Sequence, residues 1–226
     1  MSEPTYNRRT LVSGGVMAAG LLAATHSPPA VAHTATADWQ PRREPQDAWL
    51  DKPGTRHRLV VDAATAAAAA EAAAFADTFY ASNASGYGLG PDTLGVVIVL
   101  RHLATPFAYN DDVWMRFGAS FAQRLKLSGD EAIRAIRGNP LLGASASKDG
   151  ADPTLTSLAT KGARFAVCGA ATAYFARVLA KAGTTPARVE RELQENLVPG
   201  GVLMASGIVA VNRAQEHGYA FISAML

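Results

Sequence analysis

The segment that most constrains the fold is Leu94–Leu100, which has the sequence LGVVIVL. An apolar run with β-branched residues at its centre is typical of a strand buried on both faces, as in the middle of a parallel sheet. Shorter runs at 57–62, 164–168, 202–205 and 219–222 have the same character. Helical patterns separate these runs. The chain is therefore predicted to be an α/β protein, with a parallel sheet and helices on both of its faces.

Between the runs, four segments have the composition of helices. The alanine-rich stretch 63–81 is the first, and the segment 170–182, which ends before Gly183, is the second. The third has Thr185 as its predicted N-cap and Pro186 at its first position, and it ends before Pro199. The fourth covers 206–217, with Ser206 as its predicted N-cap.

The region at about 111–157 interrupts the alternation of strands and helices. We interpret it as an insertion in which 112–127 and 130–137 are candidate helices and 138–152 is a loop.

The N-terminus has the layout of a bacterial export signal. Arg8 and Arg9 precede an apolar stretch at 11–24, and small residues alternate at 30–32 and 35–37. Paired arginines before a short, weakly hydrophobic segment predict a twin-arginine signal over 1–37, and therefore a periplasmic or otherwise exported protein. A chance arginine pair and uncleaved anchoring by this segment remain alternatives. The stretch is short for a membrane span, and no later segment is apolar over the ~18 residues that a span needs.

Residues 38–56 hold three prolines and two tryptophans without periodicity. We expect them to form an extended lead-in that packs its tryptophans on the domain surface. Residues 57–226 are then long enough for one domain with a substantial core.

Composition excludes several functions. The formal net charge is +2, and no cluster of basic residues indicates nucleic-acid binding. The five histidines include no pair with metal-ligand spacing, and Gly86, Gly88 and Gly90 precede a strand, which is the wrong order for a dinucleotide site. No metal or cofactor is therefore predicted. The single cysteine rules out an internal disulfide and paired-cysteine redox chemistry.

The candidate site lies where the predicted strands end, because ligands bind at the carboxyl ends of strands in open parallel sheets. Six side chains follow these strands and are expected to meet at one rim: Asp62, Arg101, His102, Asn110, Asp111 and Cys168.

Cys168 is placed between a strand and a helix. The positive end of that helix favours the thiolate, and an imidazolium or guanidinium from His102 or Arg101 would favour it further. Each residue also has a structural interpretation. Cys168 would be a buried core residue, His102 and Arg101 solvated surface residues, and Asp62 and Asn110 helix caps.

Three segments resemble the DsrE/DsrF-like family of sulfur-relay proteins: TPFAYND at 105–111, KGARFAVC at 161–168 and VNRAQEHGYAFI at 211–222. The resemblance covers about 57–222. It implies a compact three-layer fold with a five-stranded, mainly parallel sheet, assembly into homotrimers or hexamers, and a cysteine that carries sulfur as a persulfide. Cys168 best matches that cysteine. The export signal is a departure, because the sulfur relays that serve tRNA modification or dissimilatory sulfite reduction work in the cytoplasm.

Two functions follow. In the first, Cys168 accepts or carries sulfane sulfur, assisted by Arg101 or His102, with a sulfur donor or acceptor protein as partner. In the second, the chain is a non-catalytic oligomer that binds a small ligand or a protein at the same rim, and Cys168 is structural.

Overall fold

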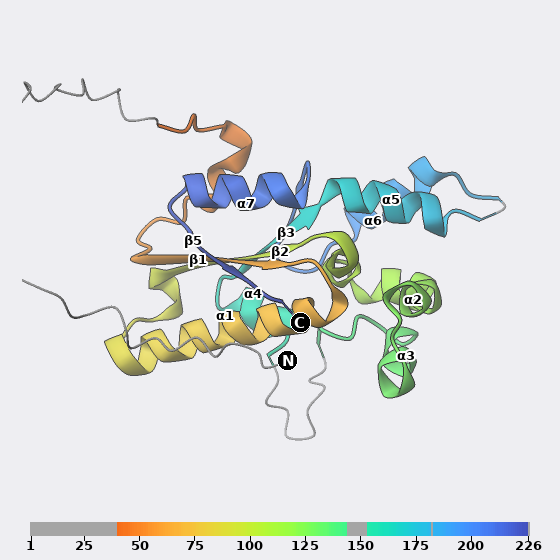
Figure 1. Ribbon diagram of the computed structural model, residues 1–226, viewed down its shortest axis with the longest axis horizontal. Helices are drawn as coiled ribbons and strands as arrows, with labels where there is room; N and C mark the ends of the chain where they lie inside the picture. The colour runs from red at the N-terminus through yellow and green to blue at the C-terminus, as the bar shows by residue number, and fades with distance from the viewer. Residues whose placement is uncertain (1–39, 144–152, 182, 226) are drawn as a thin grey trace, which may run out of the picture. The chain divides into compact units, whose positions relative to one another are not determined.

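The computed structural model describes residues 40–143, 153–181 and 183–225. The predicted export signal at 1–37 lies outside them. The described residues form one five-stranded sheet in the order β4-β3-β2-β1-β5, in which every strand pairing is parallel (Figure 1). The strands are β1 (His57–Ala63), β2 (Leu94–Leu100), β3 (Arg164–Cys168), β4 (Gly201–Met204) and β5 (Ala220–Ser223). The predicted α/β fold with a parallel sheet is confirmed.

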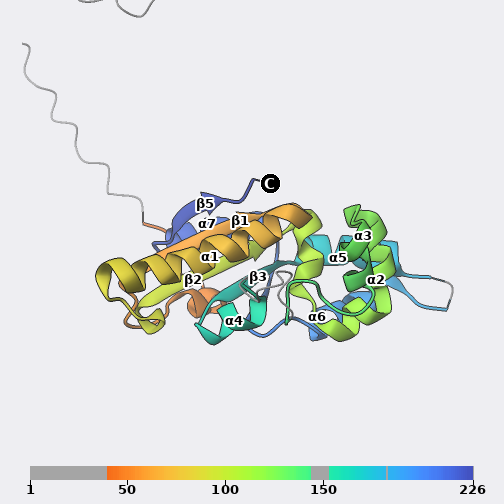
Figure 2. The same cartoon turned by 90° about the horizontal axis from the view of Figure 1, so that it is seen from below.

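Helices cover both faces of this sheet. Figures 1 and 2 show α1 and α4 on one face and α7 on the other. The α-helices are α1 (Ala66–Tyr87), α2 (Asp111–Leu125), α3 (Gly129–Ala135), α4 (Leu155–Thr160), α5 (Gly169–Leu179), α6 (Pro186–Glu195) and α7 (Gly207–Glu216). Short 3-10 helices form η1 (Pro45–Leu50), η2 (Pro91–Thr93) and η3 (His102–Ala108).

Strand β2 is central and buried along its whole length. Its side chains alternate between two hydrophobic cores, as successive residues of a strand must. Val96, Ile98 and Leu100 belong to the larger core, which α1 covers, while Val97 and Val99 belong to the smaller core under α7. The apolar run at 94–100 thus supplies both cores at once.

The first helix begins later and ends later than predicted. Ala63 still belongs to β1, and the hydroxyl of Thr65 caps α1 by accepting a hydrogen bond from the N–H of Ala68. The helix continues to Tyr87 and ends where Gly88 adopts a left-handed conformation (φ 64°), which glycine adopts without steric cost.

The insertion between β2 and β3 contains η3, α2, α3 and α4. Trp114 and Phe121 of α2 are fully buried, with ring centroids 5.0 Å apart, and belong to the larger core. The side-chain amide of Asn139 donates hydrogen bonds to the carbonyls of Phe107 and Tyr109, which tie the predicted loop to η3. Residues 144–152 of that loop lie outside the described residues.

The prediction that the lead-in is extended throughout is wrong. Pro45–Leu50 forms η1, because Pro45 suits the first turn of a helix and Leu50 can then enter the smaller core, where it is fully buried. Trp49 packs against the same core, and the hydroxyl of Tyr219 donates a hydrogen bond to the carbonyl of Leu50.

The connections after β3 and β4 leave the sheet in different directions. Helix α5 follows β3 and contributes Phe175, Ala176 and Leu179 to the larger core. Helix α7 follows β4 and contributes Ala210 and Ala214 to the smaller core on the opposite face. Adjacent strands whose connections diverge in this way leave a crevice at their carboxyl ends, which is where open α/β sheets bind ligands.

Candidate functional site

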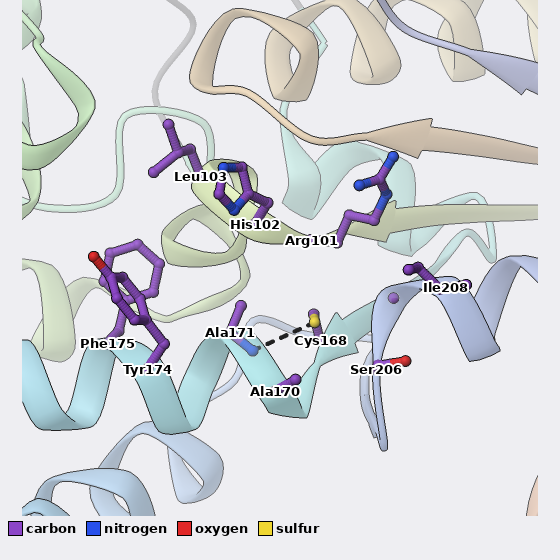
Figure 3. A pocket seen from close by; sticks show the side chains of 11 residues that line it. Arg101, His102, Leu103, Cys168, Ala170, Ala171, Tyr174, Phe175, Ser206 and Ile208 are labelled. Carbon is purple, nitrogen blue, oxygen red and sulfur yellow. Dashed lines mark hydrogen bonds between the residues drawn. The ribbon is translucent and has the colours of Figure 1, made fainter.

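A pocket of about 360 Å³ opens at this divergence between β3 and β4 (Figure 3). Its size lies in the range of small-molecule sites. Residues after β2, the start of α5 and the start of α7 line it: Arg101, His102, Leu103, Cys168, Ala170, Ala171, Tyr174, Phe175, Ser206, Gly207 and Ile208. The predicted location of the site, at the carboxyl edge of the sheet, therefore coincides with a pocket.

Cys168 is both the last residue of β3 and the N-cap of α5. Its Sγ accepts a hydrogen bond from the N–H of Ala171 at 3.4 Å and lines the pocket, as Figure 3 shows. The residue is 6% exposed. A small molecule in the pocket can therefore reach the sulfur of this buried residue, and a charged sulfur would be the better acceptor for the Ala171 N–H.

Two buried hydroxyls hold the backbone of Cys168. Thr172 donates to the Cys168 carbonyl at 3.0 Å, and Tyr109 donates to Thr172 at 2.9 Å. Burial raises the pKa of Tyr109, so this phenol keeps its proton and stays a donor. The chain of hydrogen bonds positions the residue that carries the sulfur.

Gly169 lets the start of α5 lie against the end of β4. A Cβ at this position would come within 2.7 Å of the carbonyl oxygen of Met204. The N–H of Ala170 donates to the carbonyl of Ala205 at 3.1 Å. These contacts place Cys168 next to the turn that leads into α7.

The first turn of α7 forms the opposite side of the pocket. Ser206 caps it by accepting a hydrogen bond from the N–H of Val209 at 3.3 Å. The N–H groups of Gly207 and Ile208 belong to the first turn, where no intrahelical acceptor exists. Sequence analysis assigned Ser206 only a capping role and did not include this turn in the site. The sequence held one signal for it, because Ser206 is a small residue that directly follows a strand and begins a helix.

Arg101 forms a bidentate ion pair with Asp62, from Nε to Oδ1 at 2.7 Å and from Nη2 to Oδ2 at 2.8 Å. The hydrogen bonds to Asp62 raise the pKa of Arg101 against the opposing effect of burial, and the negative charge of Asp62 contributes less. In Figure 3 the guanidinium is directed away from the sulfur. Asp62 is therefore not a helix cap, and Arg101 contributes its stem and its charge to the pocket rather than a contact with Sγ.

His102 is exposed at the pocket and has a left-handed backbone (φ 51°). A residue with a Cβ adopts this conformation at a cost of about 1–3 kcal/mol. The left-handed turn begins η3 directly after β2 and leaves the imidazole beside Leu103, as Figure 3 shows.

Asn110 and Asp111 do not line the pocket, contrary to the expectation that they would reach the rim. Asn110 caps α2 by accepting from the N–H of Val113 at 3.1 Å, and Asp111 accepts from the N–H of Asn139 at 2.8 Å. The physical reason is η3, which takes the chain away from the sheet edge before it reaches residue 110. Both side chains organise the insertion.

Comparison with known proteins finds no matching family model, no similar curated protein and no similar solved structure. Among the described residues, no three His, Cys, Asp or Glu side chains are grouped so that they could hold a metal ion. Within the same part of the chain, no helix combines the length and the apolar character needed to cross a membrane.

Proposed function

We propose that this chain is an exported, DsrE/DsrF-like sulfur-handling protein in which Cys168 carries sulfane sulfur as a persulfide. The observation that carries the proposal is the position of Sγ. It caps α5, accepts a hydrogen bond from the N–H of Ala171 and faces the pocket between the starts of α5 and α7. A thiolate in such a place is the nucleophilic form of cysteine.

The chemistry needs no second cysteine and no external oxidant. With a polysulfide as donor, the Cys168 thiolate attacks a sulfane sulfur, one S–S bond forms on the protein and one S–S bond of the donor breaks. The electron pair leaves with the shortened polysulfide. In the reverse sense, an acceptor nucleophile attacks the terminal sulfur, and the Cys168 thiolate is the leaving group.

A binding module with a structural cysteine is the second candidate. The low exposure of Cys168 and the mostly apolar lining of the pocket favour it, because both would suit an uncharged ligand and an inert thiol.

Intact-mass measurement distinguishes the two. After treatment with inorganic polysulfide, the sulfur-carrier function predicts a gain of one sulfur atom that a reductant reverses and that Cys168→Ser abolishes. The free energy of unfolding of the serine variant should lie within ~1 kcal/mol of the parent value, because serine is a good N-cap. Cys168→Ala, in contrast, loses the cap. If the native thiol reacts with neither polysulfide nor an alkylating reagent until the protein is denatured, the binding module is the better description.

The exported location and self-association are part of the same proposal. Several large apolar side chains are exposed on the two edge strands and on α7: Leu203, Ile208, Val209, Phe221 and Ile222. Such residues on edge strands support association of identical chains. Light scattering at micromolar concentration should give the mass of a trimer or hexamer, and the mass of a monomer would contradict this part of the proposal.

A further inference from the structure

Strand β5 ends the sheet on one side. Among the described residues it pairs only with β1, and Figure 2 shows it at the outside of the sheet. The N–H of Ala224 donates a hydrogen bond to the carbonyl of Asp62 on β1. Because successive backbone groups of a strand alternate in direction, Phe221 and Ser223 direct their N–H and C=O groups away from β1. These outward groups can form the hydrogen bonds of a further strand.

The side chains of β5 do not protect this edge. Phe221 is 46% exposed and Ile222 is 39% exposed, and as neighbours in a strand they point to opposite faces of the sheet. Natural edge strands are usually protected from pairing by proline or by charged side chains, and neither occurs in Ala220–Ser223. An edge with free backbone groups and apolar side chains favours the addition of an extended peptide.

A basic pocket of about 570 Å³ borders the amino end of β5. Arg56, His57 and Arg58 line it in succession, and none of its lining residues is Asp or Glu. The guanidinium of Arg58 lies 3.6 Å from the carboxylate of Asp51, which partly neutralises it. Arg56 is exposed and forms no ion pair within the described part of the chain. Its charge is therefore available to a partner.

The side of the pocket that α1 contributes is aromatic. Phe79 is partly buried there against the larger core, and Tyr87 is 78% exposed. Ala220, on the side of β5, carries only a methyl group. The pocket thus offers apolar surface and a free cation next to the backbone groups of the edge.

We propose that β5 binds an extended acidic peptide of another protein as a further strand of the sheet, independently of the chemistry at Cys168. The peptide backbone pairs with Phe221 and Ser223. One apolar side chain contacts the aromatic side of the pocket, and a carboxylate lies against Arg56.

The charge of the pocket favours such a peptide over a second copy of the same strand. A second β5 has the sequence AFIS and brings no carboxylate to Arg56. The opposite edge strand β4, with its exposed Leu203, remains for the association of identical chains.

Fluorescence anisotropy with labelled peptides and the full chain tests the proposal. The probe is a fluorescein-labelled peptide of about eight residues, in which valine and threonine alternate and glutamates stand at both ends, so that either strand direction brings a carboxylate to Arg56. The same peptide with lysine in place of glutamate should bind at least about tenfold more weakly. A version methylated on its central backbone nitrogens keeps the side chains but loses the donors, and it should not bind.

Arg56→Glu should weaken binding of the acidic peptide at least about tenfold, because it reverses the free charge of the pocket. Arg188→Glu is the matched control, since Arg188 is exposed on α6 and does not line the pocket, and binding should stay within about twofold of the parent. Phe221→Pro removes an outward N–H without removing a hydrogen bond to β1, and it should also weaken binding at least about tenfold. Phe221→Ala keeps that N–H and should bind the peptide more tightly than the proline variant.

Each contrary result overturns the proposal in a recognisable way. If the acidic peptide shows no saturable binding up to ~1 mM, β5 does not take a further strand. If the lysine peptide binds the parent equally well, or Arg56→Glu binds the acidic peptide as the parent does, the partner is not acidic. If the peptide does not bind and Phe221→Pro lowers the mass of the protein in light scattering, a second copy covers this edge. Persulfide formation at Cys168 is measured separately, and none of these results bears on it.

Discussion

The carboxylate of Asp62 on β1 accepts two hydrogen bonds from Arg101, which directly follows the adjacent strand β2. The Asp62 side chain is only 8% exposed, while that of Arg101 is 32% exposed. The pair joins the ends of two neighbouring strands. It also holds the stem of Arg101 along the wall of the pocket, against Gly207.

Asp62→Asn should destabilise the fold, because it leaves the partly buried guanidinium of Arg101 without its counter-charge. We expect a loss of about 1–3 kcal/mol in the free energy of unfolding, less than for a fully buried pair. Urea denaturation measures it. Asp77→Asn is the control: it breaks the ion pair with Lys161, in which both side chains are more than a third exposed, and should cost less than ~1 kcal/mol. Equal losses in the two variants would contradict this role of Asp62.

Gly207→Ala should disturb the pocket. The added Cβ would lie 2.4 Å from Cβ and 2.9 Å from Cδ of Arg101, so the arginine stem must move. We expect a destabilisation of about 1–3 kcal/mol together with slower alkylation or persulfidation of Cys168. Gly86→Ala, in α1, is the matched control, since nothing lies within 4 Å of its added Cβ. That variant should keep full reactivity and gain up to ~1 kcal/mol from helix propensity. A Gly207→Ala protein as stable and reactive as the parent would show that Arg101 does not depend on this close approach.

Two buried tyrosines should respond in opposite ways to removal of the hydroxyl. Tyr109→Phe removes the donor to Thr172 and should cost ~1 kcal/mol. Tyr80→Phe removes a buried hydroxyl that has no hydrogen-bond partner among the described residues, so its effect should be neutral or stabilising. Thermal or urea unfolding of both variants checks the prediction. It fails if Tyr80→Phe proves the more damaging change.

The lead-in should loosen at acidic pH. A hydrogen bond with His217 is the main cause that lowers the pKa of Asp51 below its ordinary value of 3.8, and burial opposes the shift. A carboxyl group with a lowered pKa stabilises the folded state above its unfolded-state pKa, and this contribution is lost as the pH falls through the folded-state value. Unfolding free energies of the parent and of Asp51→Asn should therefore converge as the pH is lowered below about 4. Because Asp51 is half exposed, the effect is small. A constant difference between the two proteins from neutral to acidic pH would exclude it.

Export should depend on the first arginine pair. Replacing Arg8 and Arg9 by lysine should stop periplasmic accumulation in a bacterial host with the twin-arginine pathway, because that route reads the paired arginines. The same replacement of Arg42 and Arg43, the other arginine pair, is the control and should leave export unchanged. Undiminished periplasmic protein from the first variant would count against the twin-arginine assignment.

The local sequence determined the strands of the sheet and most of its helices. The apolar run 94–100 predicts a doubly buried central strand, and the structure confirms it because such a run can only be stable when both of its faces are covered. The position of Cys168 at the junction of a strand and a helix could also be predicted from the sequence, since the change from an apolar run to small residues is a local pattern. The helix caps at Ser206 and Asn110 could be predicted too, because a capping side chain accepts a hydrogen bond from a backbone N–H only three residues away.

Only the tertiary structure decided which of these residues meet. The strand order places β5 beside β1, and α7 returns to it across the face opposite to α5. The pocket lies between the starts of α5 and α7, which diverge there. The same packing joins Asp62 to Arg101 and brings Gly207 against the arginine stem, while η3 carries Asn110 and Asp111 away. Periodicity along a chain reports which side of an element is buried, whereas the partner on that side is set by contacts between residues far apart in sequence.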